Sequence, residues 1–135
     1  MRTLYAEMLL PFPPSVNHYW RKVPRGMIVS EEGRKYNSRV AMLTLLNGRG
    51  DQDYYVRQLA HIGDMPVRVN ISAYLPDRRK RDLDNLFKVL FDSFTKNKIW
   101  EDDSQVYDIR AIKIPKTDAF PHGSVRVEIY SLYAN

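Results

Sequence analysis

Residues 66–103 read PVRVNISAYLPDRRKRDLDNLFKVLFDSFTKNKIWEDD, and they contain the clearest secondary-structure patterns of the chain. Between Pro66 and Pro76 apolar and polar residues alternate, which is the period-two pattern of a half-buried strand. From about Leu83 to Lys96 the apolar residues recur every three or four positions, which indicates an amphipathic helix. Asn97 then fits a left-handed helix stop. The stretch therefore predicts a strand, a polar turn and a helix in succession.

The flanking sequence adds further strands and a second helix. Strands are expected at residues 4–10, 106–114 and 125–132, with a short one at 27–29. Ser30 fits the N-cap of a helix that Gly48 and Gly50 end. Residues 48–65 fit either an extension of that helix or a mobile loop. We therefore expect one α+β domain over residues 1–135, with two helices packed on one mixed sheet.

Composition excludes several classes of protein. The chain has no cysteine, so a disulfide framework, a thiolate zinc site and a cysteine nucleophile are all absent. No apolar run reaches the roughly 18–20 residues that span a bilayer, and the start lacks a long apolar signal segment, so we expect a cytoplasmic protein without a membrane partner. The net charge is +5 and the pI is about 9.5, which favours a polyanionic partner such as nucleic acid.

The carboxylates of Asp82 and Asp84 are the first candidates for a metal site. Two residues apart, they point to different sides in mid-helix, but in the turn that enters a helix they can converge on one cation. Lys88 lies one helical turn beyond Asp84 and shares its face. One of the two acids could instead cap the helix, and Asp84 could form a surface ion pair with Lys88.

Asp102 and Asp103 follow the helix and precede the next strand. If the connection after Trp100 folds back, three carboxylates and one lysine meet beside the basic run of residues 78–81. Such an all-oxygen cluster suits Mg²⁺ or Mn²⁺ and would support phosphodiester cleavage.

The basic run Arg78, Arg79, Lys80 and Arg81 is either a solvated loop, a localisation signal or a phosphate-binding loop at the rim of a site. Its place between a strand and a helix favours the phosphate-binding loop. Two other metal sites fail on pattern. Counted from Asp82, an EF-hand would require glycine where Phe87 stands. A PD-(D/E)xK nuclease would require an acid two residues before a lysine, and the sequence contains none.

Residues 76–106 resemble the RusA family of crossover-junction endodeoxyribonucleases. The shared motifs are DLDN at 82–85, a lysine four residues past the second aspartate, and W-x-DD-x-x-V at 100–106. PFPPSVNHYWR at 11–21 and S-x-x-G-x-x-Y at 30–36 are also similar to the N-terminal half of that family. The ordered set of motifs is more specific than DLDN alone.

The resemblance implies a Mg²⁺-dependent homodimer that resolves Holliday (four-way) junctions by paired cleavage, in recombination and DNA repair or in phage DNA debranching. The implied catalytic residues are Asp82, Asp84, Asp103 and Lys88, with the three aspartates as metal ligands. Glu101 and Asp102 are the adjacent alternatives to Asp103. The expected DNA-binding residues are Arg78, Arg79, Lys80, Arg81, Asn17, Tyr19 and Arg21. Trp20 fits either core packing or base stacking. A twofold dimer would offer one site to each of two opposed strands of a junction.

A non-catalytic protein that binds branched DNA is the alternative from another class. The carboxylate set argues against it, because carboxylates beside phosphate weaken binding unless a cation lies between them. Such a protein would bind junctions as well or better once the acids were neutralised.

Overall fold

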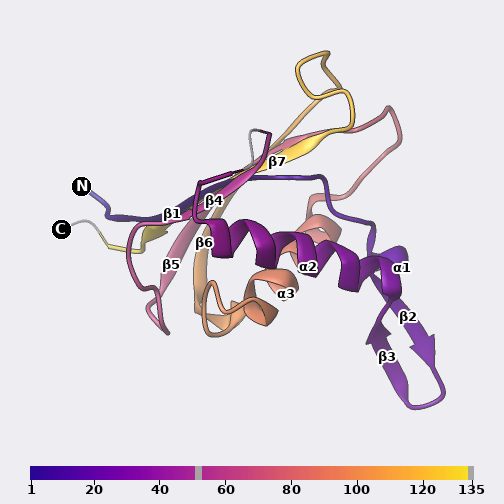
Figure 1. Ribbon diagram of the computed structural model, residues 1–135, viewed down its shortest axis with the longest axis horizontal. Helices are drawn as coiled ribbons and strands as arrows, with labels where there is room; N and C mark the ends of the chain where they lie inside the picture. Colours follow the sequence, from indigo (N-terminus) through magenta and orange to yellow (C-terminus); the bar gives the residue numbers. More distant parts are fainter. Residues whose placement is uncertain (51–52, 134–135) are drawn as a thin grey trace.

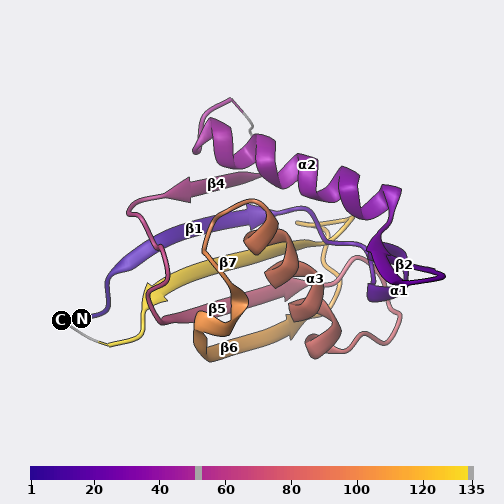
Figure 2. The same ribbon diagram turned by 90° about the horizontal axis from the view of Figure 1, so that it is seen from below.

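A computed structural model describes residues 1–50 and 53–133. A five-stranded mixed sheet forms the centre, in the order β4-β1-β7-β5-β6 (Figure 2). The strands are β1 (Leu4–Leu10), β4 (Tyr55–Gln58), β5 (Val67–Tyr74), β6 (Val106–Ile114) and β7 (Ser124–Ser131). β5 and β6 run parallel, and all other neighbours in this sheet are antiparallel.

Helices α2 (Glu31–Leu46) and α3 (Leu83–Lys96) cover one face of the sheet (Figures 1 and 2). Along β5 the residues facing the helices are buried and the alternate ones are partly exposed, as the period-two pattern predicts. This confirms the α+β class, the mixed sheet and the two packed helices. No helix within the described residues is long and apolar enough to cross a membrane.

Helix α2 begins as the sequence predicts. The Oγ atom of Ser30 accepts a hydrogen bond from the backbone N–H of Gly33 at 3.0 Å, which satisfies one of the free donors of the first turn. Tyr36, Val40 and Leu43 form the buried stripe. The helix ends at Asn47, whose φ of 50° is left-handed, immediately before Gly48.

Helix α3 has the predicted bounds, but its end differs in detail. Asn97 has a φ of −89°, and the left-handed residue is Lys98 at 57°. The Asn97 side chain donates instead to the carbonyls of Ser93 at 3.1 Å and Asn37 at 3.2 Å. The prediction of a left-handed Asn97 was wrong because this side chain ties α3 to α2 and caps the last turn directly.

Three of the elements in the described residues were not predicted from the sequence. Residues 11–26, where the sequence predicted no helix or strand, contain helix α1 (Val16–Tyr19) and strand β2 (Trp20–Val23). β2 pairs with β3 (Gly26–Val29) in a separate two-stranded sheet that projects from the body of the molecule (Figure 1). The stretch 48–65 contains β4 rather than a longer helix, and residues 51–52 within it lie outside the described residues.

Candidate active site

Asp82 and Asp84 stand where β5 has ended and α3 begins. Asp82 occupies the N-cap position, and its carbonyl accepts from the N–H of Leu86 at 3.3 Å. Within the described residues its carboxylate makes no capping hydrogen bond. Asp84 is exposed in the first turn. The capping alternative therefore explains the position of Asp82 but leaves its carboxylate available to a ligand.

A pocket of about 260 Å³ opens beside Asp82. One wall comes from the proline-rich segment and α1, including Phe12 and Asn17, and the other from the basic run and the start of α3. Asn85, the last residue of the DLDN motif, lines it together with Lys80 and Arg81. The pocket thus combines a carboxylate, two amides and two cations, which is a suitable lining for a phosphate-bearing ligand.

Lys88 lies on the exposed side of α3, one turn beyond Asp84. In the described part of the chain no ion pair joins Lys88 to Asp84, so the surface-pair alternative is not realised. Both side chains remain exposed on the helix that bears the pocket.

Arg81 is the most firmly held residue of the basic run. Its Nη2 atom donates to Asp77 at 2.9 Å, and its guanidinium lies over the Phe12 ring at 5.2 Å. The hydrogen bond from Arg81 holds the pKa of Asp77 below its usual range. The Arg81 Nε atom is buried and has no hydrogen-bond partner among the described residues. An oriented guanidinium at a pocket wall suits an anionic ligand.

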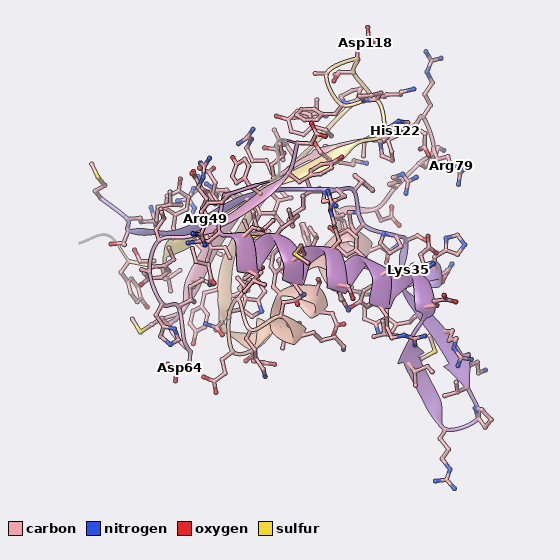
Figure 3. All side chains as sticks on the ribbon, viewed as in Figure 1. Lys35, Arg49, Asp64, Arg79, Asp118 and His122 are labelled. Carbon is pink, nitrogen blue, oxygen red and sulfur yellow. The ribbon has the colours of Figure 1, made fainter. Side chains whose placement is uncertain are left out.

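The rest of the basic run is open to solvent. Arg78, Arg79 and Lys80 are exposed. The Arg79 side chain has a loose contact of 3.6 Å with Asp77, whose Oδ1 also accepts from the Arg79 backbone N–H at 3.0 Å. Figure 3 shows Arg79 beyond one end of the sheet, on the same side as His122. The run is therefore an ordered loop at the rim of the pocket, as its position between a strand and a helix predicted.

Asp103 lies at the other end of α3, in the 3₁₀ turn η1 (Asp103–Gln105). Asp102 caps this turn by accepting from the N–H of Ser104 at 3.0 Å. Hydrogen bonding from the Ser104 side chain, followed by that from its backbone N–H, lowers the pKa of Asp102. The Gln105 side chain is buried. Its Oε1 atom accepts from the N–H of Asp102, which completes a capping box, and its Nε2 atom donates to the carbonyls of Gly63 and Met65. Asp102 thus has a structural role, whereas the Asp103 side chain is exposed.

The expected meeting of three carboxylates does not occur within one chain. A helix of 14 residues, about 21 Å long, separates Asp82 and Asp84 from the turn that holds Asp103. Figure 3 places Arg79, close to the first pair in sequence, and Asp64, next to the Gly63 that anchors the turn, at opposite ends of the molecule. Among the described residues, no three histidine, cysteine, aspartate or glutamate side chains are grouped so that they could hold a metal ion. The connection after Trp100 returns to the start of β5, not to its end.

Trp100, the first residue of the W-x-DD motif, belongs to the core. It is 1% exposed, packs edge-on against Phe91 and Phe94, and donates to the Thr95 hydroxyl at 2.9 Å. It fixes the direction in which the chain leaves α3, and hence the position of Asp103.

The N-terminal residues that the sequence offered for DNA contact lie in different environments. Asn17 lines the pocket, and Arg21 is exposed on β2. Tyr19 is fully buried, and its hydroxyl donates to Asp92 at 2.6 Å and accepts from Asn37 at 2.8 Å. Burial, followed by the Asp92 hydrogen bond, raises the pKa of Tyr19. Its assignment to DNA binding was wrong, because it has no exposed surface. Trp20 is partly buried, with its ring 4.5 Å from that of Tyr19.

Sequence reasoning passed over Asn85, Gln105 and Lys113. Asn85 could have been found from its place in DLDN, one residue past the second acid. Gln105 could have been read as the N3 residue of a capping box whose N-cap is Asp102. Lys113, whose Nζ donates to the Arg81 carbonyl at 3.0 Å, has no local sequence signal because 32 residues separate the two.

Comparison with known proteins agrees with the motifs. The sequence profile of the family described as "Endodeoxyribonuclease RusA" matches residues 11–130. The crossover junction endodeoxyribonuclease RusA of Escherichia coli (strain K12) is 44% identical over 112 residues, covering 82% of this chain and 84% of the relative. The proteins of the same name from Enterobacteria phage 82 and Shigella sonnei (strain Ss046) are each 42% identical over the same shares. The chain therefore belongs to the RusA family of endodeoxyribonucleases.

Proposed function

We propose that this protein is a Mg²⁺-dependent resolvase that makes paired cuts in four-way DNA junctions as a symmetric homodimer. The observation that carries the proposal is the pocket at the start of α3, where the Asp82 carboxylate, which makes no capping hydrogen bond within the described residues, lies beside Arg81 and two amides. The names of the relatives point to the same substrate, since they are called crossover junction endodeoxyribonucleases.

The donor chemistry of the pocket fits a hard cation. Asp82 offers carboxylate oxygens and Asn17 and Asn85 offer amide oxygens in the pocket lining, and Asp84 adds a carboxylate in the first turn of α3. Mg²⁺ is usually held by one or two carboxylates, with waters and substrate phosphate completing its shell. Mn²⁺ has the same preference for oxygen and is the expected substitute. When bound, Mg²⁺ would supply water activation and charge stabilisation at the scissile phosphate.

The basic residues bind and orient the DNA strand in this proposal. Arg81 is held in place by Asp77 and Phe12, so its guanidinium is a fixed cation for a backbone phosphate at the pocket wall. Arg78, Arg79 and Lys80 neutralise neighbouring phosphates from the rim. Lys88 approaches from the exposed side of α3 and stabilises charge that develops at the reacting phosphate.

Asp103 and Asp82 lie far apart within one chain, so a site that contains both residues would require a homodimer. Strand β6 is the terminal strand of the sheet and exposes Tyr107, Ile109 and Ile112 by 68%, 39% and 57%. A long, partly apolar sheet edge is a template for pairing with a second chain. The turn with Asp103 lies at the start of β6, and Lys113 ties its end to the basic run.

Antiparallel pairing of two β6 edges about a twofold axis places the start of each strand beside the end of the other. Asp103 of one copy then approaches the Asp82 and Asp84 of a second copy, and the same occurs at the other end. Each completed site would hold three carboxylates and serve one of two opposed strands of the junction.

The test is cleavage of a labelled synthetic four-way junction, with a matched linear duplex as control, in Mg²⁺ or EDTA. The wild-type protein should give paired nicks near the branch only with the junction and Mg²⁺, and Asp82→Asn should bind the junction without cutting it. Tight junction binding with no cleavage in Mg²⁺ or Mn²⁺ would overturn the proposal and favour the non-catalytic binding protein.

A further inference from the structure

The β2–β3 arm, residues 20–29, is a second functional candidate that the pocket does not use. It is a two-stranded ribbon about 13 Å long that has no pairing with the main sheet and extends away from it (Figure 1). A two-stranded ribbon of this kind has little core of its own. Its sequence, WRKVPRGMIV, has three cations and no acid.

The arm exposes apolar side chains where a ribbon on the surface would normally carry polar ones. Met27 is 60% exposed and Ile28 is 39% exposed. The register places each opposite a cation, with Lys22 across from Met27 on one face and Arg21 across from Ile28 on the other. Each face of the ribbon therefore presents one apolar and one cationic side chain.

The root of the arm is fixed to the body. The N–H of Ser30 donates to the Tyr19 carbonyl at 2.8 Å, and the Ser30 hydroxyl donates to the carbonyl of His18. Tyr19 is bonded to Asp92 on α3, one turn beyond Lys88. A Cβ at Gly33 would lie 2.5 Å from the Tyr19 carbonyl oxygen, so only glycine allows α2 to approach this root. These contacts hold the arm in a set direction.

The arm also begins at the wall of the pocket. Asn17 lines the pocket beside Asp82, and only two residues separate it from Trp20, the first residue of β2. A DNA strand held in the pocket therefore has the arm as its immediate neighbour. The three cations of the arm are complementary to the negative charge of the DNA backbone.

We propose that the β2–β3 arm enters the branch point of the DNA, where Met27 and Ile28 stack on the base-pair faces that a junction exposes and Arg21 and Lys22 contact the adjoining phosphates. This inference rests on the proposed function. Apolar side chains, methionine and isoleucine included, are used as wedges between base steps. A continuous duplex offers no exposed base-pair face except at its ends, so the arm contributes to the choice of junction over duplex.

The test compares Met27→Thr/Ile28→Thr with Met42→Gln, which removes a 54% exposed methionine from α2 as a matched control. Threonine keeps the β propensity of the ribbon, and circular dichroism verifies that both variants fold. Affinities for a four-way junction and for a linear duplex are measured in EDTA at one salt concentration. The branch-point base pairs carry 2-aminopurine, whose fluorescence reports unstacking.

The double variant should lose roughly tenfold or more in junction affinity, with duplex affinity unchanged and the fluorescence response reduced, because it lacks two apolar side chains that DNA binding would bury. Met42→Gln should match the wild type in each measurement. An unchanged preference for the junction, or equal losses on junction and duplex, overturns the role of the arm. If the wild type itself shows no preference for the junction, the proposed function fails first, and the two failures are thereby distinguished.

Discussion

Asp82 and Asp103 flank the same helix but lie at its opposite ends, separated by the 14 residues of α3. Within one chain they cannot hold the same ion, since the helix is about 21 Å long. If each site is completed by a second copy, the two residues of one chain serve two different sites. This relationship can be tested by mixing variants.

Asp82→Asn and Asp103→Asn should each lower the cleavage rate by on the order of 100-fold or more. Subunits of the two variants, unfolded together and refolded as a mixture, should recover nicking activity. In a mixed dimer one site carries both substitutions and the other carries neither. Recovery should be limited to nicks in one strand of each junction, measured on denaturing gels. Mixtures as inactive as the separate variants would show that each site lies within one chain.

Arg81 and Arg78 form a matched pair for testing the phosphate donor. Arg81→Gln should weaken DNA binding by about 10-fold or more, because a hydrogen bond to a charged group contributes about 1.5–3 kcal/mol. Arg78→Gln removes the same charge from an exposed, unoriented position and should cost less. Both variants should lower the slope of log affinity against log salt by about one. Equal losses in the two variants would contradict a specific role for the oriented Arg81 guanidinium.

Substitutions at Asp102 and at Asp103 should distinguish a structural role from a catalytic one. Asp102→Ala removes the cap of η1 and should lower the melting temperature by a few degrees, with cleavage still measurable below it. Asp103→Asn should leave the melting temperature unchanged and abolish cleavage. Because the folded-state pKa of Asp102 is lowered, its stabilisation is present at neutral pH and is lost as the pH falls through that pKa. The melting temperatures of wild type and Asp102→Ala should therefore converge in acid. If Asp102 rather than Asp103 is the catalytic residue, Asp102→Ala should lose cleavage even below its melting temperature.

The sequence predicted the elements that carry a strong period. β1, α3 and β6 have the expected bounds, because alternation in strands and a three-to-four-residue apolar repeat in α3 both reflect burial on one face. The short elements α1, β2 and β4 were missed, since four residues give too few repeats for either period. β4 exists because it pairs with β1, a contact 50 residues away.

The candidate site was predictable in composition but not in arrangement. The spacing of Asp82, Asp84 and Lys88 follows from the start of one helix, which local sequence signals. The position of Asp103 depends on the hydrogen bonds from Gln105 to Gly63 and Met65, across about 40 residues, and no local pattern encodes them. Tyr19 was misassigned for a similar reason, because its partners Asn37 and Asp92 come from two different helices.

Tyr19→Phe distinguishes the buried role of this residue from a DNA contact. The change removes a hydroxyl that bonds Asp92 and Asn37 and should lower the free energy of unfolding by about 1–2 kcal/mol, the usual cost of losing a buried hydrogen bond and leaving its partner groups unsatisfied. Asp92 retains its contact with Lys96 at 3.0 Å, which limits the loss. Urea denaturation measures the stability, and junction affinity is measured well below the unfolding midpoint. Reduced stability with unchanged affinity is expected, because phenylalanine fills the same space at the root of the arm. Unchanged stability with weakened DNA binding would restore Tyr19 to the DNA-binding surface.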